Sequence, residues 1–221
     1  NDLISAAMLD DAMLVNAKNP DRAIIRLNEI WREVLDGVEG GKKAFFEAIE
    51  KAAFDLQEIE QKAPLHTLPH VLIVGEIYVR KDGISRRWLP ERMAQHGIVS
   101  HVAPLHEWIH YVDWLVVNKE HMFGASTMSR MKTRLKNSIM SRGERSIKAT
   151  MEGSGWYIKR LINIDHVIDA SKQYISPKLP GEAVVTTGGP LAEVGTEFCG
   201  AIAIGPFGCM PNRLSESILN L

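Results

Sequence analysis

The sequence predicts an α/β protein, in which a Rossmann-like parallel sheet of at least three strands is flanked by helices and preceded by an all-helical segment. Three observations predict this fold. Residues 71–74 and 201–204 are short, uninterrupted apolar runs, which are typical of strands buried on both faces. A third predicted strand, at 98–103, follows the first after about a dozen residues of helical pattern, the spacing of a strand–helix–strand unit. Residues 1–62 carry helical apolar spacing only.

The helical segment, residues 1–64, is expected to pack as a lead segment on the α/β lobe, residues 65–221. Asn19-Pro20 breaks the apolar pattern and separates a first helix from a second, for which Asp21 is the expected cap. The glycines between 37 and 41 are expected to end that second helix. A third helix is then predicted from about Lys42 to Lys62.

The middle of the chain changes to alternating elements. After the strand at 71–74, Ser85 is expected to cap a helix that continues to Gln95, where His96-Gly97 closes it. The strand at 98–103 leads into a helix over about 105–115. Residues 126–150 predict one or more polar, basic helices.

The remaining elements complete the sheet. Residues 158–175 predict a helix, whereas 181–198 are ambiguous between a strand near Val184 and a helix near Pro190. The apolar run at 201–204 then supplies the third strand, and a helix is expected to begin near Asn212.

Composition excludes several classes of protein. A formal net charge of −1 gives no whole-molecule field that would attract nucleic acid or an anionic membrane. Two cysteines are too few for a disulfide scaffold, so a reducing cytoplasm is expected. No apolar run reaches the length of a membrane span, and nothing resembles a signal peptide. A chain that begins at Asn1 and ends within a helical pattern at Leu221 is expected to be a fragment of a longer polypeptide.

Chemically useful side chains follow each predicted strand. Because ligands of open parallel sheets bind outside the carboxyl ends of the strands, these side chains are expected to line one cleft. Cys209 lies in a turn of glycines and prolines between a strand and a helix, where helix N-terminal amides favour a thiolate. The candidate cleft residues are Glu76, Tyr78 and Arg80 after the first strand, Glu107 and Trp108 after the second, and Cys209 after the last.

A second interpretation uses the pattern His106-Glu107-x-x-His110. On a helix the two histidines would lie one turn apart and could hold zinc, with Glu107 as general base of a hydrolase. The extended form of this motif is missing, since Asp113 stands where it has glycine. The possible third ligands are Glu120, Glu144 and Glu152, and nothing in the sequence selects among them.

The basic stretch around residues 130–148 has three interpretations. It could be a solvated helix face, a surface for an acidic partner or phosphate-bearing substrate, or a nucleic-acid site. Aromatic residues are not interleaved with the basic ones, which disfavours nucleic acid. A chain that served only as a non-catalytic docking lobe would use this helix as its interaction surface.

Three stretches together resemble one family. They are Val74–Arg80, Ala103-Pro104 with Glu107-Trp108 and Tyr111 after it, and Gly205–Pro211 with the sequence GPFGCMP. Over about residues 10–221 the chain resembles the dehydratase-like portion of acyl-CoA dehydratase activase-related proteins, also called CoA-substrate-specific enzyme activases. That portion is similar to the subunits of 2-hydroxyacyl-CoA dehydratases.

The resemblance implies a role in anaerobic acyl-CoA metabolism or in ATP-linked electron transfer to it. It implies that the full-length protein holds a 4Fe–4S cluster and that Cys209 is a candidate cluster ligand. The remaining ligands would come from a missing lobe of the same chain, so the cluster is expected to be absent from this fragment. The implied partners are that lobe, actin-like ATPase domains and an acyl-CoA substrate; a membrane is not among them. The resemblance leaves open whether the parent is a lyase component or an activase.

Overall fold

The structure is a computed structural model, which describes residues 6–118, 126–179 and 181–220 of the chain. These residues form two compact units, each built from several stretches of the chain. We call them the helical unit (residues 1–69, 89–100 and 143–161) and the sheet unit (residues 70–88, 101–142 and 162–221). None of the helices in the described ranges is both long enough and apolar enough to cross a bilayer.

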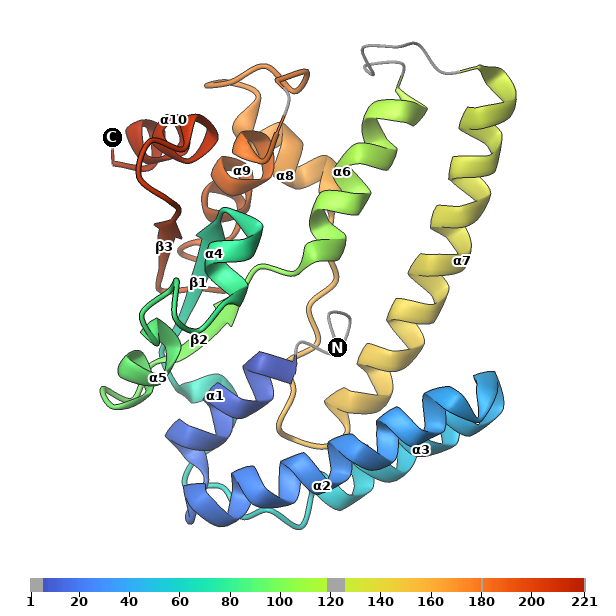
Figure 1. The fold of residues 1–221 in the computed structure, drawn as a ribbon, viewed down its shortest axis with the longest axis vertical. Helices are drawn as coiled ribbons and strands as arrows, with labels where there is room; N and C mark the ends of the chain where they lie inside the picture. Colours follow the sequence, from blue (N-terminus) through green and yellow to red (C-terminus); the bar gives the residue numbers. More distant parts are fainter. Residues whose placement is uncertain (1–5, 119–125, 180, 221) are drawn as a thin grey trace. The chain divides into compact units, whose positions relative to one another are not determined.

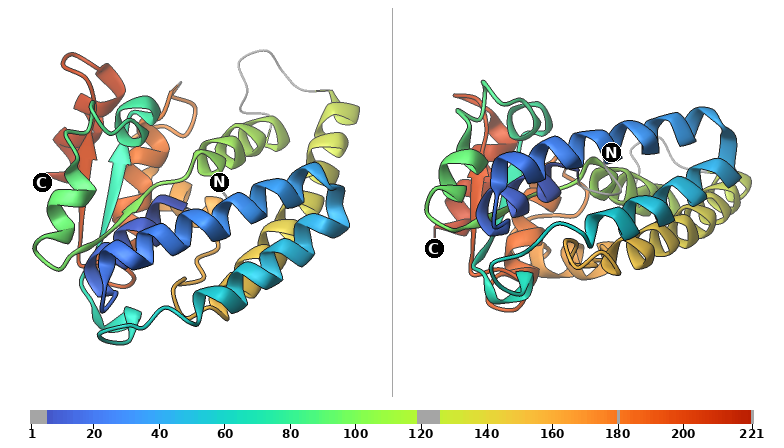
Figure 2. Two further views of the ribbon diagram at one scale, coloured as in Figure 1. Left: turned by 60° about the horizontal axis from the view of Figure 1, so that its bottom comes forward. Right: turned by 90° about the horizontal axis from the view of Figure 1, so that it is seen from below.

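The helical unit begins with three helices, α1 (Ala6–Asn16), α2 (Pro20–Glu39) and α3 (Gly41–Leu56). Helices α2 and α3 run side by side as a hairpin (Figures 1 and 2). The side-chain oxygen of Asn19 accepts a hydrogen bond from the Arg22 amide at 3.1 Å, so Asn19 caps α2. The prediction that Asp21 caps this helix is wrong. The helix already begins at Pro20, and its first turn is a position that suits proline.

Two boundaries of this hairpin also differ from prediction. Helix α2 continues through Gly37 to Glu39, and α3 ends at Leu56 rather than near Lys62. Gly37 serves packing instead of ending the helix, because a Cβ atom there would lie 2.7 Å from the Cβ of Ala48 on α3. Its missing side chain lets the two helices approach closely.

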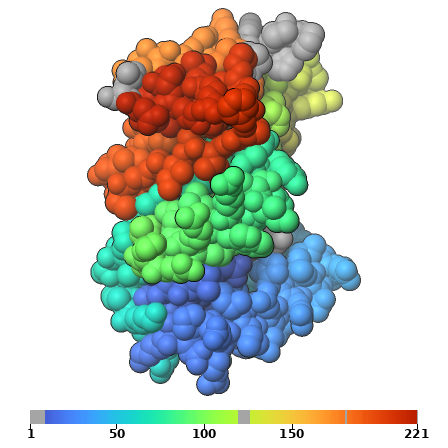
Figure 3. Space-filling model, turned by 60° about the vertical axis from the view of Figure 1, so that its left-hand side comes forward, coloured from blue at the N-terminus to red at the C-terminus, as the bar shows by residue number. Residues whose placement is uncertain are grey.

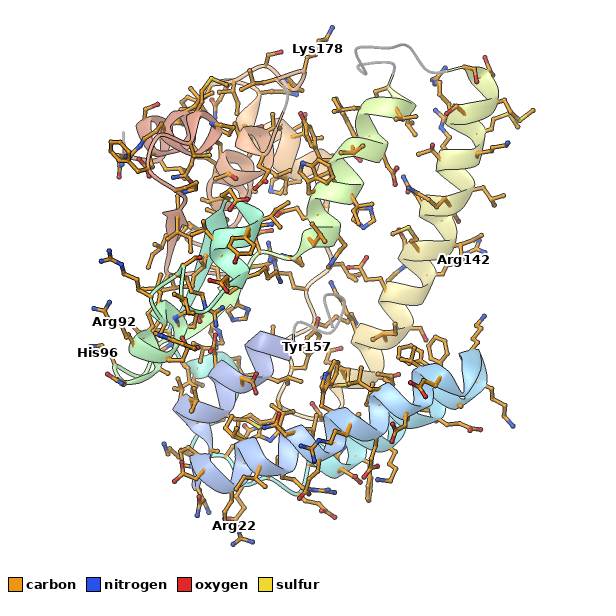
Figure 4. All side chains as sticks on the ribbon, viewed as in Figure 1. Arg22, Arg92, His96, Arg142, Tyr157 and Lys178 are labelled. Atoms are coloured by element: carbon orange, nitrogen blue, oxygen red, sulfur yellow. The ribbon has the colours of Figure 1, made fainter. Side chains whose placement is uncertain are left out.

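The core of the helical unit gathers apolar side chains from all of its segments. Trp156, which is fully buried, follows the C-terminal end of α7 (Thr127–Glu152), and its indole nitrogen donates to the Ile59 carbonyl at 3.1 Å. Tyr157, labelled in Figure 4, is buried beside it. Burial raises the pKa of the Tyr157 hydroxyl, and the neighbouring Glu144 carboxylate raises that pKa further.

The sheet confirms the predicted fold class. Three parallel strands, β1 (His70–Gly75), β2 (Val99–Val102) and β3 (Gly200–Ile204), lie in the order β2-β1-β3. The register between β1 and β3 runs from Val71 opposite Gly200 to Gly75 opposite Ile204. Strand β1 is central, and its residues 72–74 are fully buried, as an uninterrupted apolar run predicts.

Helices of the sheet unit pack around these strands (Figure 1). Helix α9 (Ala183–Glu193) contacts β1, β3, α8 (Ile164–Ser171) and α10 (Met210–Leu219), and α6 (Leu105–Val117) contacts α8 and α9. The short α4 (Ile77–Lys81) follows β1 directly. The remaining short helices, α5 (Leu89–Ala94) and the 3-10 turn η1 (Leu65–Thr67), belong to the helical unit.

Several helices and strands differ between the prediction and the structure. The helix expected from Ser85 to Gln95 is reduced to α5, because Arg87 and Trp88 have φ angles of 52° and 53°, which interrupt a right-handed helix. The helix expected over 158–175 is reduced to α8. The ambiguous stretch near Val184 is helical rather than extended, and residues 183–190 are buried on all sides, so their apolar run carried no helical periodicity.

Candidate functional site

The loops that leave the carboxyl ends of β1 and β3 are joined to each other. The backbone amide of Glu76 donates to the Ile204 carbonyl at 3.0 Å. Gly75 makes this approach possible, because its φ is +112° and a Cβ atom on it would lie 1.9 Å from the Ile204 oxygen. The sheet therefore places the residues after β1 beside those after β3.

Glu76 opens helix α4. Its side-chain Oε2 accepts a hydrogen bond from the Val79 amide at 2.8 Å, which caps the helix. Four residues on, Arg80 turns back toward the sheet, where only 1% of it is exposed and its Nη1 donates to the Gly75 carbonyl at 2.8 Å. This turn thus brings a carboxylate and a buried guanidinium to the edge of the sheet.

Cys209 occupies the corresponding place after β3. It is the N-cap residue of α10, its amide donates to the Pro206 carbonyl at 3.1 Å, and its own carbonyl accepts from Arg213 at 2.9 Å. The residue is half-buried. Helix α10 and the end of β3, coloured red in Figure 3, lie on the surface of the sheet unit. The thiol therefore stands at the start of a surface helix, as the sequence predicts.

A small pocket unites these elements. Its volume is about 100 Å³, and the described residues that line it include both Glu76 and Cys209. Helix α9 contributes its N-terminal residues, and α10 contributes its first turn. The full lining is Glu76, Gly181, Glu182, Thr186, Cys209, Pro211 and Asn212.

The second carboxyl group of this pocket favours its neutral form. Burial raises the pKa of Glu182, and the Glu76 carboxylate raises it further. The Arg80 guanidinium and a hydrogen bond from the Ile77 amide act in the opposite direction. Burial and the Glu76 carboxylate together outweigh the Arg80 guanidinium and the Ile77 amide, so the neutral form of Glu182 persists to higher pH than in a free glutamate.

Asn212 forms a buried wall of the pocket, with 3% of its surface exposed. Its Nδ2 donates to the Glu216 Oε1 at 2.7 Å, which fixes the orientation of the amide. Its Oδ1 and the Glu182 Oε2 are both buried and accept no hydrogen bond from the described residues. The pocket therefore combines a thiol with two buried oxygen atoms that accept no hydrogen bond from the described residues.

The other predicted cleft residues lie outside this lining. Tyr78 is 66% exposed on α4, whereas Arg80 lies beneath the edge. Glu107 is 2% exposed, and its Oε1 would lie 3.6 Å from a Cβ on Gly189 of α9. Trp108 packs against the apolar cluster that contains Tyr111, Val167 and Ile168. Of the six predicted residues, the pocket brings together Glu76 and Cys209.

The histidines of the zinc pattern lie on α6, as the pattern requires. The rings of His106 and His110 meet edge to face, with centroids 5.8 Å apart. Glu144 and Glu152, two possible third ligands, belong to the helical unit and bind Lys148 and Lys159; Glu120 lies outside the described residues. In the described ranges, no group of three or more His, Cys, Asp or Glu side chains is placed to hold a metal ion.

Cys199 lies at the other end of β3. It is exposed, and its thiol donates to the His70 carbonyl at 3.1 Å. Strand β3 separates the two cysteines, and its five residues at about 3.3 Å each span more than a cluster does. Cys199 and Cys209 therefore cannot bind the same cluster.

Sequence reasoning missed Glu182, Thr186 and Asn212. Glu182 and Thr186 fall in or beside the stretch that was ambiguous between strand and helix, so their side of the sheet was not defined. Asn212 could have been predicted from the sequence, because it falls in the first turn of the helix after Cys209, where a side chain lies close to the N-cap residue. Comparisons with protein families, with curated proteins and with solved structures found no match to this chain.

Proposed function

We propose that this chain is one lobe of a larger iron–sulfur protein and that Cys209 supplies one thiolate ligand of a shared 4Fe–4S cluster. The observation that carries the proposal is the position of Cys209 beside Glu76 at the carboxyl edge of the sheet, half-buried and at the start of α10. Clusters of this type are bound by cysteine thiolates, and a helix N-terminus favours the thiolate form. The resemblance of the surrounding sequence to activase-related proteins supports the same assignment.

The described residues fit such a cluster only in part. Cys209 is the single cysteine at this edge, since Cys199 lies beyond the other end of β3. The remaining thiolates must then come from a second lobe, which makes the cluster a bridge between lobes. This requirement agrees with a parent that carries further lobes and ATPase domains, works in the reducing cytoplasm and takes an acyl-CoA substrate.

When bound, the cluster would supply low-potential electrons for anaerobic acyl-CoA chemistry. This chain would bind the cluster through Cys209, position the residues after β1 through the Glu76 cap of α4, and form one wall of the site with the buried Asn212. Burial raises the pKa of Glu182, so this carboxyl group beside the ligand ionises less readily than a free glutamate.

Anaerobic reconstitution of the full-length protein with iron and sulfide tests the proposal. The Cys209→Ser variant is expected to lose bound iron and the broad visible absorption of the cluster. The matched Cys199→Ser variant, which changes the cysteine just before the opposite end of β3, should retain both. An iron content in Cys209→Ser equal to that of the wild type would remove Cys209 from the ligand set and with it the proposal.

A further inference from the structure

Helix α7 carries an exposed apolar stripe on its first four turns. Its members recur at intervals of three, four and four residues, so they line one side of a helix with about 3.6 residues per turn. Each is more than 60% exposed, which is unusual for large apolar side chains that follow one another along a helix. The stripe consists of Met128, Met131, Leu135 and Ile139.

The opposite side of the same helix already packs within the sheet unit. Arg130 donates through its Nε to the Val117 carbonyl on α6 at 2.8 Å, and Lys136 binds Asp113 of α6 at 2.6 Å. Thr133, Asn137 and Met140 are half-buried. The stripe is therefore a second apolar surface, one that the packing of α6 and α7 leaves uncovered.

Basic side chains border the stripe on both sides. At about 100° per residue, Lys132 lies along one border and Arg134 along the other, and both are exposed. Arg142, labelled on α7 in Figure 4, extends the line of the stripe by one turn. Residues 127–143 contain no aspartate or glutamate, so nothing on this part of the helix neutralises the positive borders.

We propose that this stripe is the docking surface for an amphipathic helix of a partner protein whose apolar seam is flanked by acidic side chains. Charge complementarity selects this occupant, because two copies of α7 facing each other would bring Lys132, Arg134 and Arg142 against the same positive residues. The intervals of three and four residues match the seam of a packed helix pair. Methionine side chains adapt readily to the surface of a helical ligand.

A membrane surface suits the stripe less well. Helices that lie in the bilayer interface bury a broad apolar face that includes tryptophan, phenylalanine or leucine. Residues 126–143 contain no aromatic side chain, and the stripe is a single row. The inference is independent of Cys209, since α7 contributes nothing to the pocket at the sheet edge.

The test is a fluorescence anisotropy titration of the whole chain with a labelled synthetic helix of about 25 residues, long enough to fold on contact. Its seam would carry leucine at the same intervals, flanked by glutamate. We expect binding in the micromolar range that weakens when ionic strength rises from roughly 0.05 to 0.5 M, because salt screens the flanking charges. A matched peptide with lysine flanks should not bind.

Variants of the chain locate the surface. Leu135→Glu places a charge in the stripe and should weaken binding at least ~10-fold, whereas Ser129→Glu adds the same charge at an exposed position outside the stripe and should not. The double variant Lys132→Glu/Arg134→Glu should exchange the preference and bind the lysine-flanked peptide. Circular dichroism and melting curves verify that each variant is folded.

Three results would overturn the proposal. The first is failure of the acidic peptide to bind the wild type at concentrations up to about 1 mM, which corresponds to negligible affinity. The second is tight binding to phosphatidylglycerol vesicles but not to the peptide, which would assign the stripe to a lipid surface. The third is self-association of the wild type that Leu135→Glu abolishes, which would assign it to a second copy.

Discussion

Gly188 of α9 lies directly against the backbone of Val167 on α8: a Cβ atom on Gly188 would lie 2.1 Å from the Val167 carbonyl oxygen. Helices α8 and α9 are among the most closely packed neighbours of the sheet unit. The Gly188→Ala substitution must therefore separate the two helices or distort one of them. We expect it to lower the free energy of unfolding by about 3 kcal/mol or more, measured by chemical denaturation.

Gly143→Ala is the matched control. Gly143 also lies within a helix, α7, but a Cβ atom there would meet nothing within 4 Å. Because alanine is the better helix former, this variant should be more stable than the wild type by about 0.5–1 kcal/mol. Equal effects of the two substitutions would contradict the close approach of α8 and α9.

A buried ion pair in the helical unit gives the second prediction. The Lys148 ammonium lies 2.5 Å from the Glu144 Oε1 and 2.6 Å from the Arg160 carbonyl, and both side chains are almost fully buried. Lys148→Met should cost about 3–5 kcal/mol, because the buried Glu144 carboxylate loses the Lys148 ammonium. The measurement is again the free energy of unfolding.

The double variant Glu144→Leu/Lys148→Met separates the charge from the packing. Removing both partners removes the uncompensated charge, so the double variant should be clearly more stable than Lys148→Met alone. If the double variant is as unstable as the single one, packing of the lysine chain rather than its pairing stabilises this region.

The sheet could be predicted from the sequence because its strands depend on local pattern. Four consecutive apolar residues at 71–74 and the apolar run at 201–204 predict strands on their own, and parallel strands end at the same edge. The proximity of Glu76 and Cys209 follows from those two facts. Their shared pocket was therefore within reach of sequence reasoning.

The rest of the site depends on packing that a single sequence does not encode locally. Residues 183–190 of helix α9 are all buried, so Val184 and Thr187 show the composition of a strand while they lie in a helix. Without that helix, neither Glu182 nor Thr186 can be assigned to the pocket. Similarly, the left-handed backbone at Arg87 and Trp88, which shortens α5, has no glycine to indicate it.

The pocket at the sheet edge predicts a dependence of stability on pH. Because burial raises the pKa of Glu182 from its usual 4.5, the folded chain holds this proton more tightly than the unfolded chain. The resulting stabilisation is present below pH 4.5 and is lost as the pH rises through the raised pKa. Glu182→Gln cannot ionise, so it should gain stability relative to the wild type as the pH rises through that window.

Denaturation of both proteins across pH 4–8 measures this difference, with about one pH unit between points. In the Glu76→Gln background, the pH range over which the wild type loses stability relative to Glu182→Gln should move to lower pH. The Glu76 charge that helps to raise the pKa of Glu182 is absent there. Parallel stability profiles of the wild type and Glu182→Gln would mean that Glu182 ionises in the fold as it does in the unfolded chain.

Tyr111 connects α6 to the segment that leads into the pocket. Its hydroxyl, on a buried side chain, lies 2.9 Å from the Pro177 carbonyl and 3.0 Å from the Leu179 carbonyl, and it donates to this pair of acceptors. Two residues after Leu179, Gly181 begins the pocket lining. Tyr111→Phe should cost about 1–2 kcal/mol at neutral pH, because these two half-buried carbonyl groups lose their donor.

Stability measurements at alkaline pH distinguish the contribution of the Tyr111 hydroxyl from that of its ring. Burial raises the pKa of Tyr111 from 10 to about 12, so the wild type keeps the contribution of the protonated hydroxyl below pH 10 and loses it as the pH rises toward 12. The stability difference between the wild type and Tyr111→Phe should therefore shrink over this range, as followed by urea denaturation at fixed ionic strength. A constant difference would place its origin in packing of the ring, because phenylalanine preserves the ring but cannot ionise. The hydrogen bonds to Pro177 and Leu179 would then contribute nothing to holding the pocket segment on α6.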